Sequence, residues 1–375
     1  MKKFVSVIIC FAIVLSFPMS VNAEEKPNVN AEAYVLYCAD NGEIIASKDE
    51  NKRMKPASTT KLMTTLLTLE QAAKGNKTVT FTKDMVAEGS SMYLKLGEKV
   101  KLSDLAVGMM MSSGNDAANA AAISISGSDG KFAELMNERA KQIGMKGTHF
   151  VTPSGLDDDN HYSTAYDLAL LMAEGLKNED FRNLTSQKSA TVDFTEPADK
   201  RVTYSNHNRL LSLYEYCIGG KTGYTMAAGR CLVSAAEKDG LTLICVTLND
   251  RNDWNDHKAL YEYGFSQLAM YTSPDSYFCA EVPLVGAESD SVMVMGEDDF
   301  SLVTSESDKD KIERKIYLDS FLYAPIKEND TVGKIEYFLD GESVGGTALK
   351  AAQTVSEKKI HISIFQKIKE FFNHG

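Results

Sequence analysis

The chain has 375 residues, 43% of them hydrophobic and 25% charged, which is typical of a folded soluble protein. Its formal net charge is −12 and no basic cluster with interleaved aromatic residues occurs, so we expect no nucleic-acid partner. The six histidines show no close metal-ligand spacing. A zinc peptidase is therefore poorly supported, and we expect no metal and no other cofactor.

The N-terminus has the pattern of an export signal. Lys2 and Lys3 precede an apolar stretch over residues 4–17, and Val21-Asn22-Ala23 forms a small-x-small cleavage site. The alternative is a retained membrane anchor, against which the short apolar run argues. We therefore predict a signal peptide over residues 1–23 and an exported mature protein.

Five cysteines remain in the predicted mature chain after Cys10 is removed with the signal. An odd number without a C-x-x-C pair does not indicate a disulfide framework. We therefore expect buried free thiols.

The sequence pattern in the first part of the mature chain predicts a hairpin followed by helices. Residues 33–39 and 43–47 read as strands joined by a turn at Asp40-Asn41-Gly42. A helix is expected from about Ser58 to Gly75, with leucines and a methionine on one face. Further helices are predicted over residues 103–111, 116–126, 131–143 and 163–177, the last with Ser163 as N-cap.

A second group of strands closes this part of the chain. Residues 217–223, 229–236 and 241–248 are β-rich, and Asp239-Gly240 turns the last two into a hairpin. A final helix is expected over residues 256–270. This order predicts an α+β domain over residues 24–273, with one antiparallel sheet built from both ends and flanked by helices.

The rest of the chain changes character at about residue 274. Short alternating segments predict a small all-β domain over residues 274–353. Residues 354–375 are expected to form an amphipathic helix, because five apolar residues share one helical face and lysines flank it. Such a helix suits a membrane surface. The alternative is a helix docked on the β domain.

Three short motifs carry the chemistry. In chain order they are Ser58-Thr59-Thr60-Lys61, Ser113-Gly114-Asn115 and Lys221-Thr222-Gly223. Each motif alone occurs by chance in many proteins. Together, in this order and in these contexts, they form the signature of penicillin-recognising serine acyl-transferases.

The first motif predicts a nucleophile and its base. Ser58 and Lys61 lie one helical turn apart, so their side chains share one face. A serine hydroxyl needs a neighbouring base to become a nucleophile. Lys61 can be that base only if burial or a nearby cation lowers its pKa, and Lys221 is the expected cation.

The other motifs predict contacts with a substrate. We expect Ser113 to relay a proton to the leaving nitrogen, and Asn115 to contact the substrate backbone. Ser112 competes with Ser113 by position, but Ser113 has the S-x-N spacing.

The third motif lies on a predicted strand. Gly223 lets an extended peptide approach the strand edge, while Lys221 and Thr222 supply donors for a terminal carboxylate. The backbone N–H groups of Ser58 and Tyr224 are the expected oxyanion donors. Arg251 is a candidate second carboxylate clamp, although a solvated loop arginine is an equal alternative.

These residues resemble those of the low-molecular-mass penicillin-binding proteins, specifically the serine-type D-alanyl-D-alanine carboxypeptidases. The sequences around Ser58, at residues 148–157 and at residues 220–225 are similar to those of this family. The resemblance covers nearly all of the mature chain. The hairpin at residues 337–341 and the amphipathic C-terminus resemble the family's β-rich stalk and membrane anchor. Tyr224 stands where some relatives carry histidine, which leaves the deacylation rate and pH profile open.

The resemblance implies a β-lactamase/transpeptidase-like fold and a serine DD-carboxypeptidase. Its substrates would be peptidoglycan stem peptides ending in D-Ala-D-Ala, and Ser58 would form the acyl-enzyme, with Lys61 as base. β-Lactams would be covalent inhibitors, and the protein would work at the outer face of the cytoplasmic membrane. By the same resemblance, Ser113, Asn115, Lys221 and Thr222 would line the site.

Three other functions remain as alternatives. A β-lactamase on this scaffold would need a glutamate in an E-x-x-L-N loop, and residues 174–183 do not fit that pattern. A non-catalytic wall-binding protein would be expected to have lost Ser58 or Lys61. A transpeptidase or endopeptidase stays open, because water and an amine can attack the same acyl-enzyme.

Overall fold

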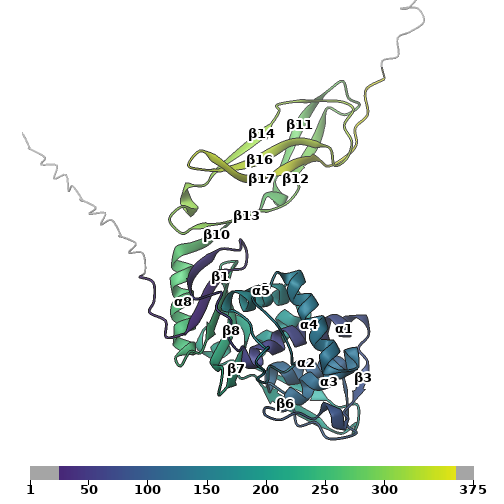
Figure 1. The fold of residues 1–375 in the computed structure, drawn as a ribbon. Helices are drawn as coiled ribbons and strands as arrows, with labels where there is room; N and C mark the ends of the chain where they lie inside the picture. The colour runs from purple at the N-terminus through teal and green to yellow at the C-terminus, as the bar shows by residue number, and fades with distance from the viewer. Residues whose placement is uncertain (1–24, 360–375) are drawn as a thin grey trace, which may run out of the picture.

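The computed structural model describes residues 25–359, which form a helix-and-sheet domain with an elongated β domain at one end (Figure 1). The predicted signal peptide over residues 1–23 and residues 360–375 of the predicted anchor helix lie outside the described residues. Within residues 25–359, no helix is long and apolar enough to span a bilayer.

The larger domain is built on a five-stranded antiparallel sheet. Its strand order is β2 (Ile44–Lys48), β1 (Ala33–Cys38), β9 (Leu241–Leu248), β8 (Gly229–Lys238) and β7 (Cys217–Thr225). The N-terminal hairpin thus pairs with the last strand, as predicted for a sheet built from both ends of the domain. Strand β7 forms one edge of this sheet.

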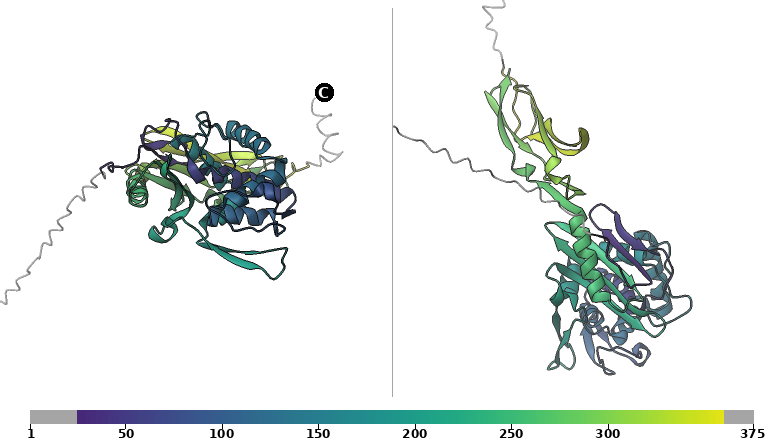
Figure 2. Two further views of the ribbon diagram at one scale, coloured as in Figure 1. Left: turned by 60° about the horizontal axis from the view of Figure 1, so that its bottom comes forward. Right: turned by 90° about the vertical axis from the view of Figure 1, so that its left-hand side faces the viewer.

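Helices cover both faces of the sheet, as Figure 2 shows. On one face α8 (Asp253–Gln267) packs through Leu260 and Tyr261 against Leu36 and Leu243. The other face carries the remaining main helices, which are α1 (Lys61–Lys74), α2 (Leu102–Met111), α3 (Asn115–Ser126), α4 (Asp129–Ile143), α5 (Ala165–Leu176) and α6 (Glu179–Ser186). Every residue of β9 is buried, since this central strand is covered on both sides. The predicted fold class is confirmed.

Several element boundaries differ from the prediction by a few residues, and two of these differences have a clear physical reason. Thr164, rather than Ser163, caps α5, because its hydroxyl accepts a hydrogen bond from the Asp167 amide at 3.0 Å. The predicted helix over residues 256–270 ends at Gln267, and β10 (Leu268–Ser273) follows it. Strand β10 pairs with β13 (Phe300–Ser305), so backbone pairing replaces the last turn of the expected helix.

Some elements were not predicted. They include α6, the short helix α7 (Leu210–Leu213), and the two-stranded pairs β3 (Thr78–Thr80) with β4 (Lys99–Lys101) and β5 (Ser189–Asp193) with β6 (Arg201–Ser205). These short strands carry mixed polar sequences, so alternation alone did not reveal them.

The second domain is all β, as predicted. Its six-stranded sheet has the order β14 (Glu313–Leu318), β16 (Thr331–Leu339), β17 (Glu342–Ala351), β12 (Ser291–Gly296), β11 (Cys279–Val285) and β15 (Leu322–Tyr323). Residues 354–359 are not helical. Val355 bridges to Ile326 and Glu357 to Ala287, so backbone pairing continues the β domain to the end of the described chain.

Candidate active site

A cleft of about 430 Å³ opens beside the edge strand β7. It lies between that strand, the 3-10 turn η1 (Ala57–Thr60) and the break between α2 and α3. The cleft is lined by Ser58, Ser90, Ser113, His207, Thr222, Gly223, Tyr224, Arg230, Cys231, Asp253 and Trp254. The three sequence motifs, which are up to 163 residues apart along the chain, thus meet at one site.

Ser58 and Lys61 are in direct contact. Ser58 sits in η1 and Lys61 is the first residue of α1, so one tight helical turn brings the Lys61 Nζ to 2.9 Å from the Ser58 Oγ. The Lys61 side chain is fully buried. Its Nζ also donates to the Asn115 Oδ1 at 2.7 Å and to the Ser154 carbonyl at 2.6 Å.

These contacts orient the amine when it is neutral. The Asn115 Oδ1 and the Ser154 carbonyl can only accept, so they take both N–H groups of a neutral Lys61 amine. The remaining position on the nitrogen, its lone pair, then faces the Ser58 hydroxyl. A neutral Lys61 is therefore placed to accept the serine proton.

The electrostatics favour that neutral form. Burial, and next the charge of Lys221, hold the pKa of Lys61 well below its usual value, although Asp116 opposes them. Burial also lowers the pKa of Lys221 to about 7. Lys221 thus lies where its charge, when present, lowers the pKa of Lys61, and its role as that cation stays a prediction.

The second motif is held in a strained loop. Ser113 has a φ of +56°, unusual for a residue with a side chain, and its Oγ accepts from the Lys221 Nζ at 3.0 Å. Asn115 begins α3, and its Nδ2 donates to the Glu88 carbonyl at 2.6 Å. This bond fixes which end of the amide faces Lys61.

The edge of β7 lies very close to Ser58. A Cβ added at Gly223 would be 3.0 Å from the Pro56 carbonyl, the Ser58 nitrogen and the Thr59 nitrogen. Such contacts are tighter than ordinary packing allows, so glycine is required here for a steric reason. The next side chain, Tyr224, is 65% exposed at the mouth of the cleft.

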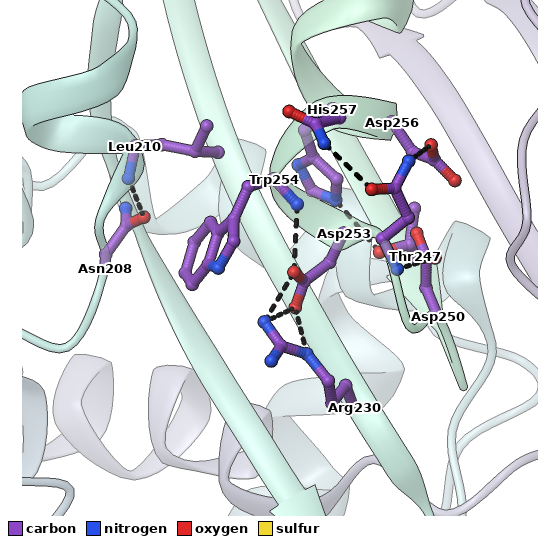
Figure 3. Close-up of polar contacts among 11 residues, drawn as sticks. Asn208, Leu210, Arg230, Thr247, Asp250, Asp253, Trp254, Asp256 and His257 are labelled. Atoms are coloured by element: carbon purple, nitrogen blue, oxygen red, sulfur yellow. Dashed lines mark hydrogen bonds and ion pairs between the residues drawn. The ribbon is translucent and has the colours of Figure 1, made fainter.

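Lys221 and Arg251, which sequence analysis proposed as ligands of the substrate carboxylate, do not line the cleft. Lys221 is buried and bonds to Ser113 and to the Thr222 carbonyl at 2.7 Å, behind the cleft surface. Arg251 is exposed and does not line the cleft. Arg230 does line it, and its guanidinium forms an ion pair with Asp253 (Figure 3).

Sequence reasoning missed Arg230, Asp253 and Trp254 as cleft residues. Arg230 lies at the start of β8 and the other two at the start of α8, so they come together only in the folded sheet. Cys231 also lines the cleft, but burial raises its pKa to about 12, so it stays a thiol and does not compete with Ser58.

Comparison with known proteins agrees with this geometry. Residues 20–252 match the family of D-alanyl-D-alanine carboxypeptidases, and residues 265–357 match the penicillin-binding protein 5 C-terminal domain. The chain belongs to the D-alanyl-D-alanine carboxypeptidase family. Its three motifs meet at one cleft, as the resemblance implied, and the enzyme is a serine peptidase of this type.

Individual relatives cover nearly the whole chain. The D-alanyl-D-alanine carboxypeptidase DacF of Bacillus subtilis is 30% identical over 95% of both chains, and DacC of Escherichia coli is 32% identical over 89% of this chain and 86% of its own. Penicillin-binding protein 5 of Haemophilus influenzae superposes with a TM-score of 0.65 at 29% identity, covering 88% of this chain and 99% of its own.

Proposed function

We propose that the protein removes the terminal D-alanine from peptidoglycan stem peptides through an acyl-enzyme on Ser58. The observation that carries this proposal is the 2.9 Å contact between the Ser58 Oγ and the buried Lys61 Nζ. The neutral amine takes the hydroxyl proton while the oxygen attacks the carbonyl carbon of the penultimate D-alanine. The backbone N–H groups of Ser58 and Tyr224 are the proposed donors to the oxyanion.

Departure of D-alanine requires a proton on its nitrogen. Ser113 lines the cleft, and its Oγ lies 3.0 Å from the Lys221 Nζ. With a pKa of about 7, Lys221 can give and take a proton near neutral pH. We assign the relay to Ser113 and Lys221, and the contact with the substrate backbone to Asn115.

Water then hydrolyses the acyl-enzyme and restores Ser58. The same nucleophile would open a β-lactam ring, so we propose that β-lactams acylate Ser58 and inhibit the enzyme. An amine could replace water at this step, which would make the enzyme a transpeptidase, and attack on a crosslink would make it an endopeptidase.

Export and membrane attachment are also proposed. The pattern of residues 1–23 supports export to the cell-wall compartment, where peptidoglycan is found. The apolar and basic faces of the sequence after Ser356 support attachment to the membrane surface. Deletion of residues 357–375 should release the mature protein from membrane pellets, and unchanged sedimentation would refute the anchor.

The decisive experiment is release of D-alanine. The mature protein and a Ser58→Ala variant are incubated with a stem pentapeptide ending in D-Ala-D-Ala, and free D-alanine is measured. Release by the native protein alone supports the proposal and assigns the nucleophile. Stable penicillin labelling without release would indicate a transpeptidase or a binding role, and neither labelling nor release would refute the catalytic site.

A further inference from the structure

A loop over residues 149–162 carries a backbone acceptor that orients Lys61. The two ends of this loop are joined by antiparallel backbone pairing. Near its middle, the Ser154 carbonyl accepts from the Lys61 Nζ at 2.6 Å. The preceding carbonyl, that of Pro153, accepts from the Thr64 hydroxyl of α1, also at 2.6 Å. The position of the loop on α1 therefore decides whether the Lys61 amine keeps this acceptor.

The His161 side chain holds the loop from within. Its Nδ1 accepts from the Val151 amide at 3.0 Å and from the Thr152 amide at 3.2 Å. These two amides come shortly before Ser154 in the chain, so a bond to them limits where its carbonyl can lie. The Nε2 of the same ring lies 2.8 Å from the Oγ1 of Thr60, the last residue of η1. One buried ring thus joins the loop to the turn that leads into α1.

These contacts require a neutral ring in one tautomer. A backbone amide can only donate, so the His161 Nδ1 is the acceptor and carries no proton. The proton of the neutral ring is then on Nε2, which donates to the Thr60 hydroxyl. His161 is 2% exposed, and burial lowers its pKa to about 4. At neutral pH the ring is therefore uncharged and keeps all three contacts.

The loop packs directly against η1. A Cβ added at Gly155 would overlap the Ala57 carbonyl, so the two backbones touch. The Phe150 ring packs against the His161 ring, with 5.7 Å between their centroids. A shift of about 1 Å in a group that positions reacting atoms can slow a reaction about 100-fold. Loss of the bonds to His161 would permit such a shift of the Ser154 carbonyl.

We propose that His161 is a positioning residue for acylation, which holds the Ser154 carbonyl against Lys61 so that the lone pair of the amine stays directed at Ser58. This inference rests on the proposed acylation of Ser58. His161 does not line the cleft, so it acts through the loop and not by contact with the substrate. Its loss should therefore slow the chemical step without weakening the binding that precedes it.

Penicillin labelling at increasing penicillin concentration separates these two effects. The rate at saturation reports the chemical step, and the half-saturating concentration reports binding. Both are measured where circular dichroism shows folded protein. In His161→Leu the saturating rate should fall about 10- to 100-fold, with half-saturation unchanged within about twofold. In His161→Asn the amide oxygen can replace Nδ1 as acceptor, so its saturating rate should be at least about threefold above that of His161→Leu.

His257→Asn is the matched control. His257 is a fully buried histidine of the same domain, and its ring bonds to Ser234 and Thr247. This variant should lose stability but keep the native saturating rate. An equal fall of that rate in His257→Asn would overturn the proposal, because loss of any buried histidine would then have the same effect. An unchanged rate in folded His161→Leu would also overturn it.

The Thr60→Val variant decides the question if His161→Leu does not fold. Valine has nearly the same size as threonine but removes the partner of Nε2, so the saturating rate should fall about threefold or more. A native rate in this variant would overturn the proposal. Native protein without any label would refute the acylation of Ser58 and this inference together. A labelled native protein with unaffected variants would refute the role of His161 alone.

Discussion

Replacement of Lys221 by methionine should change how the stability of the protein depends on pH. Lys221 is 2% exposed, and burial lowers its pKa to about 7 in the folded state. In the unfolded chain a lysine has a pKa of about 10.4. Between these values the unfolded chain binds the proton that the folded protein releases, so the stability of the native protein rises with pH. Methionine has a similar length and no charge, so the variant lacks this contribution.

The size of the effect follows from the two pKa values. Over each pH unit in which the folded protein binds one proton fewer than the unfolded chain, the free energy of unfolding rises by about 1.4 kcal/mol. From pH 7 to pH 9, with Lys221 half protonated at the start, the gain is about 2 kcal/mol. This gain should be present in the native protein and missing in Lys221→Met.

Urea unfolding at pH 7 and pH 9 measures this difference. The free energy of unfolding is extrapolated to water for the native protein, for Lys221→Met and for Lys188→Met, which removes an exposed lysine as a control. Only the change between the two pH values is compared, because the methionine also alters packing and the bonds to Ser113 and Thr222. The same pH-dependent gain in Lys221→Met as in the native protein would show that Lys221 is not a neutral buried amine.

Three further predictions concern the site and the second domain. Lys61→Ala should slow penicillin acylation about 10²- to 10⁴-fold by removing the base, and a nearly unchanged rate in stopped-flow labelling would exclude Lys61 from that role. Gly223→Ala should reduce the acylation rate about tenfold or more by pushing β7 away from Ser58, while the circular dichroism spectrum stays the same. An unaffected rate would mean that this edge is not closely packed. Asp275→Asn should destabilise the β domain by about 2–4 kcal/mol, because the buried carboxylate accepts bonds from Arg314 and Tyr337. Limited proteolysis should then cut this domain first while penicillin acylation stays unchanged, because Asp275 lies in the β domain and does not line the cleft. Proteolysis that cuts the larger domain first would contradict this prediction.

Local patterns were sufficient to predict the larger elements and the contact between Ser58 and Lys61. The Asp40-Asn41-Gly42 turn and the apolar face after Ser58 predicted the first hairpin and α1 because both depend on residues close in sequence. Ser58 and Lys61 are one turn apart, so helical geometry alone brings them together. By contrast, β10 follows α8 directly and is a strand only because β13 lies beside it.

The sequence by itself determined the family of this protein, since three motifs in one order are typical of serine D-alanyl-D-alanine carboxypeptidases and predict the serine, the lysine and the strand of the site. Only the tertiary structure decided which charged groups line the cleft. The fold buries the Lys221 side chain, leaves Arg251 exposed outside the cleft and brings Arg230 of β8 into contact with Asp253 of α8. The physical reason is that these contacts depend on strand register and on the position of α8, which residues far apart in the chain set together.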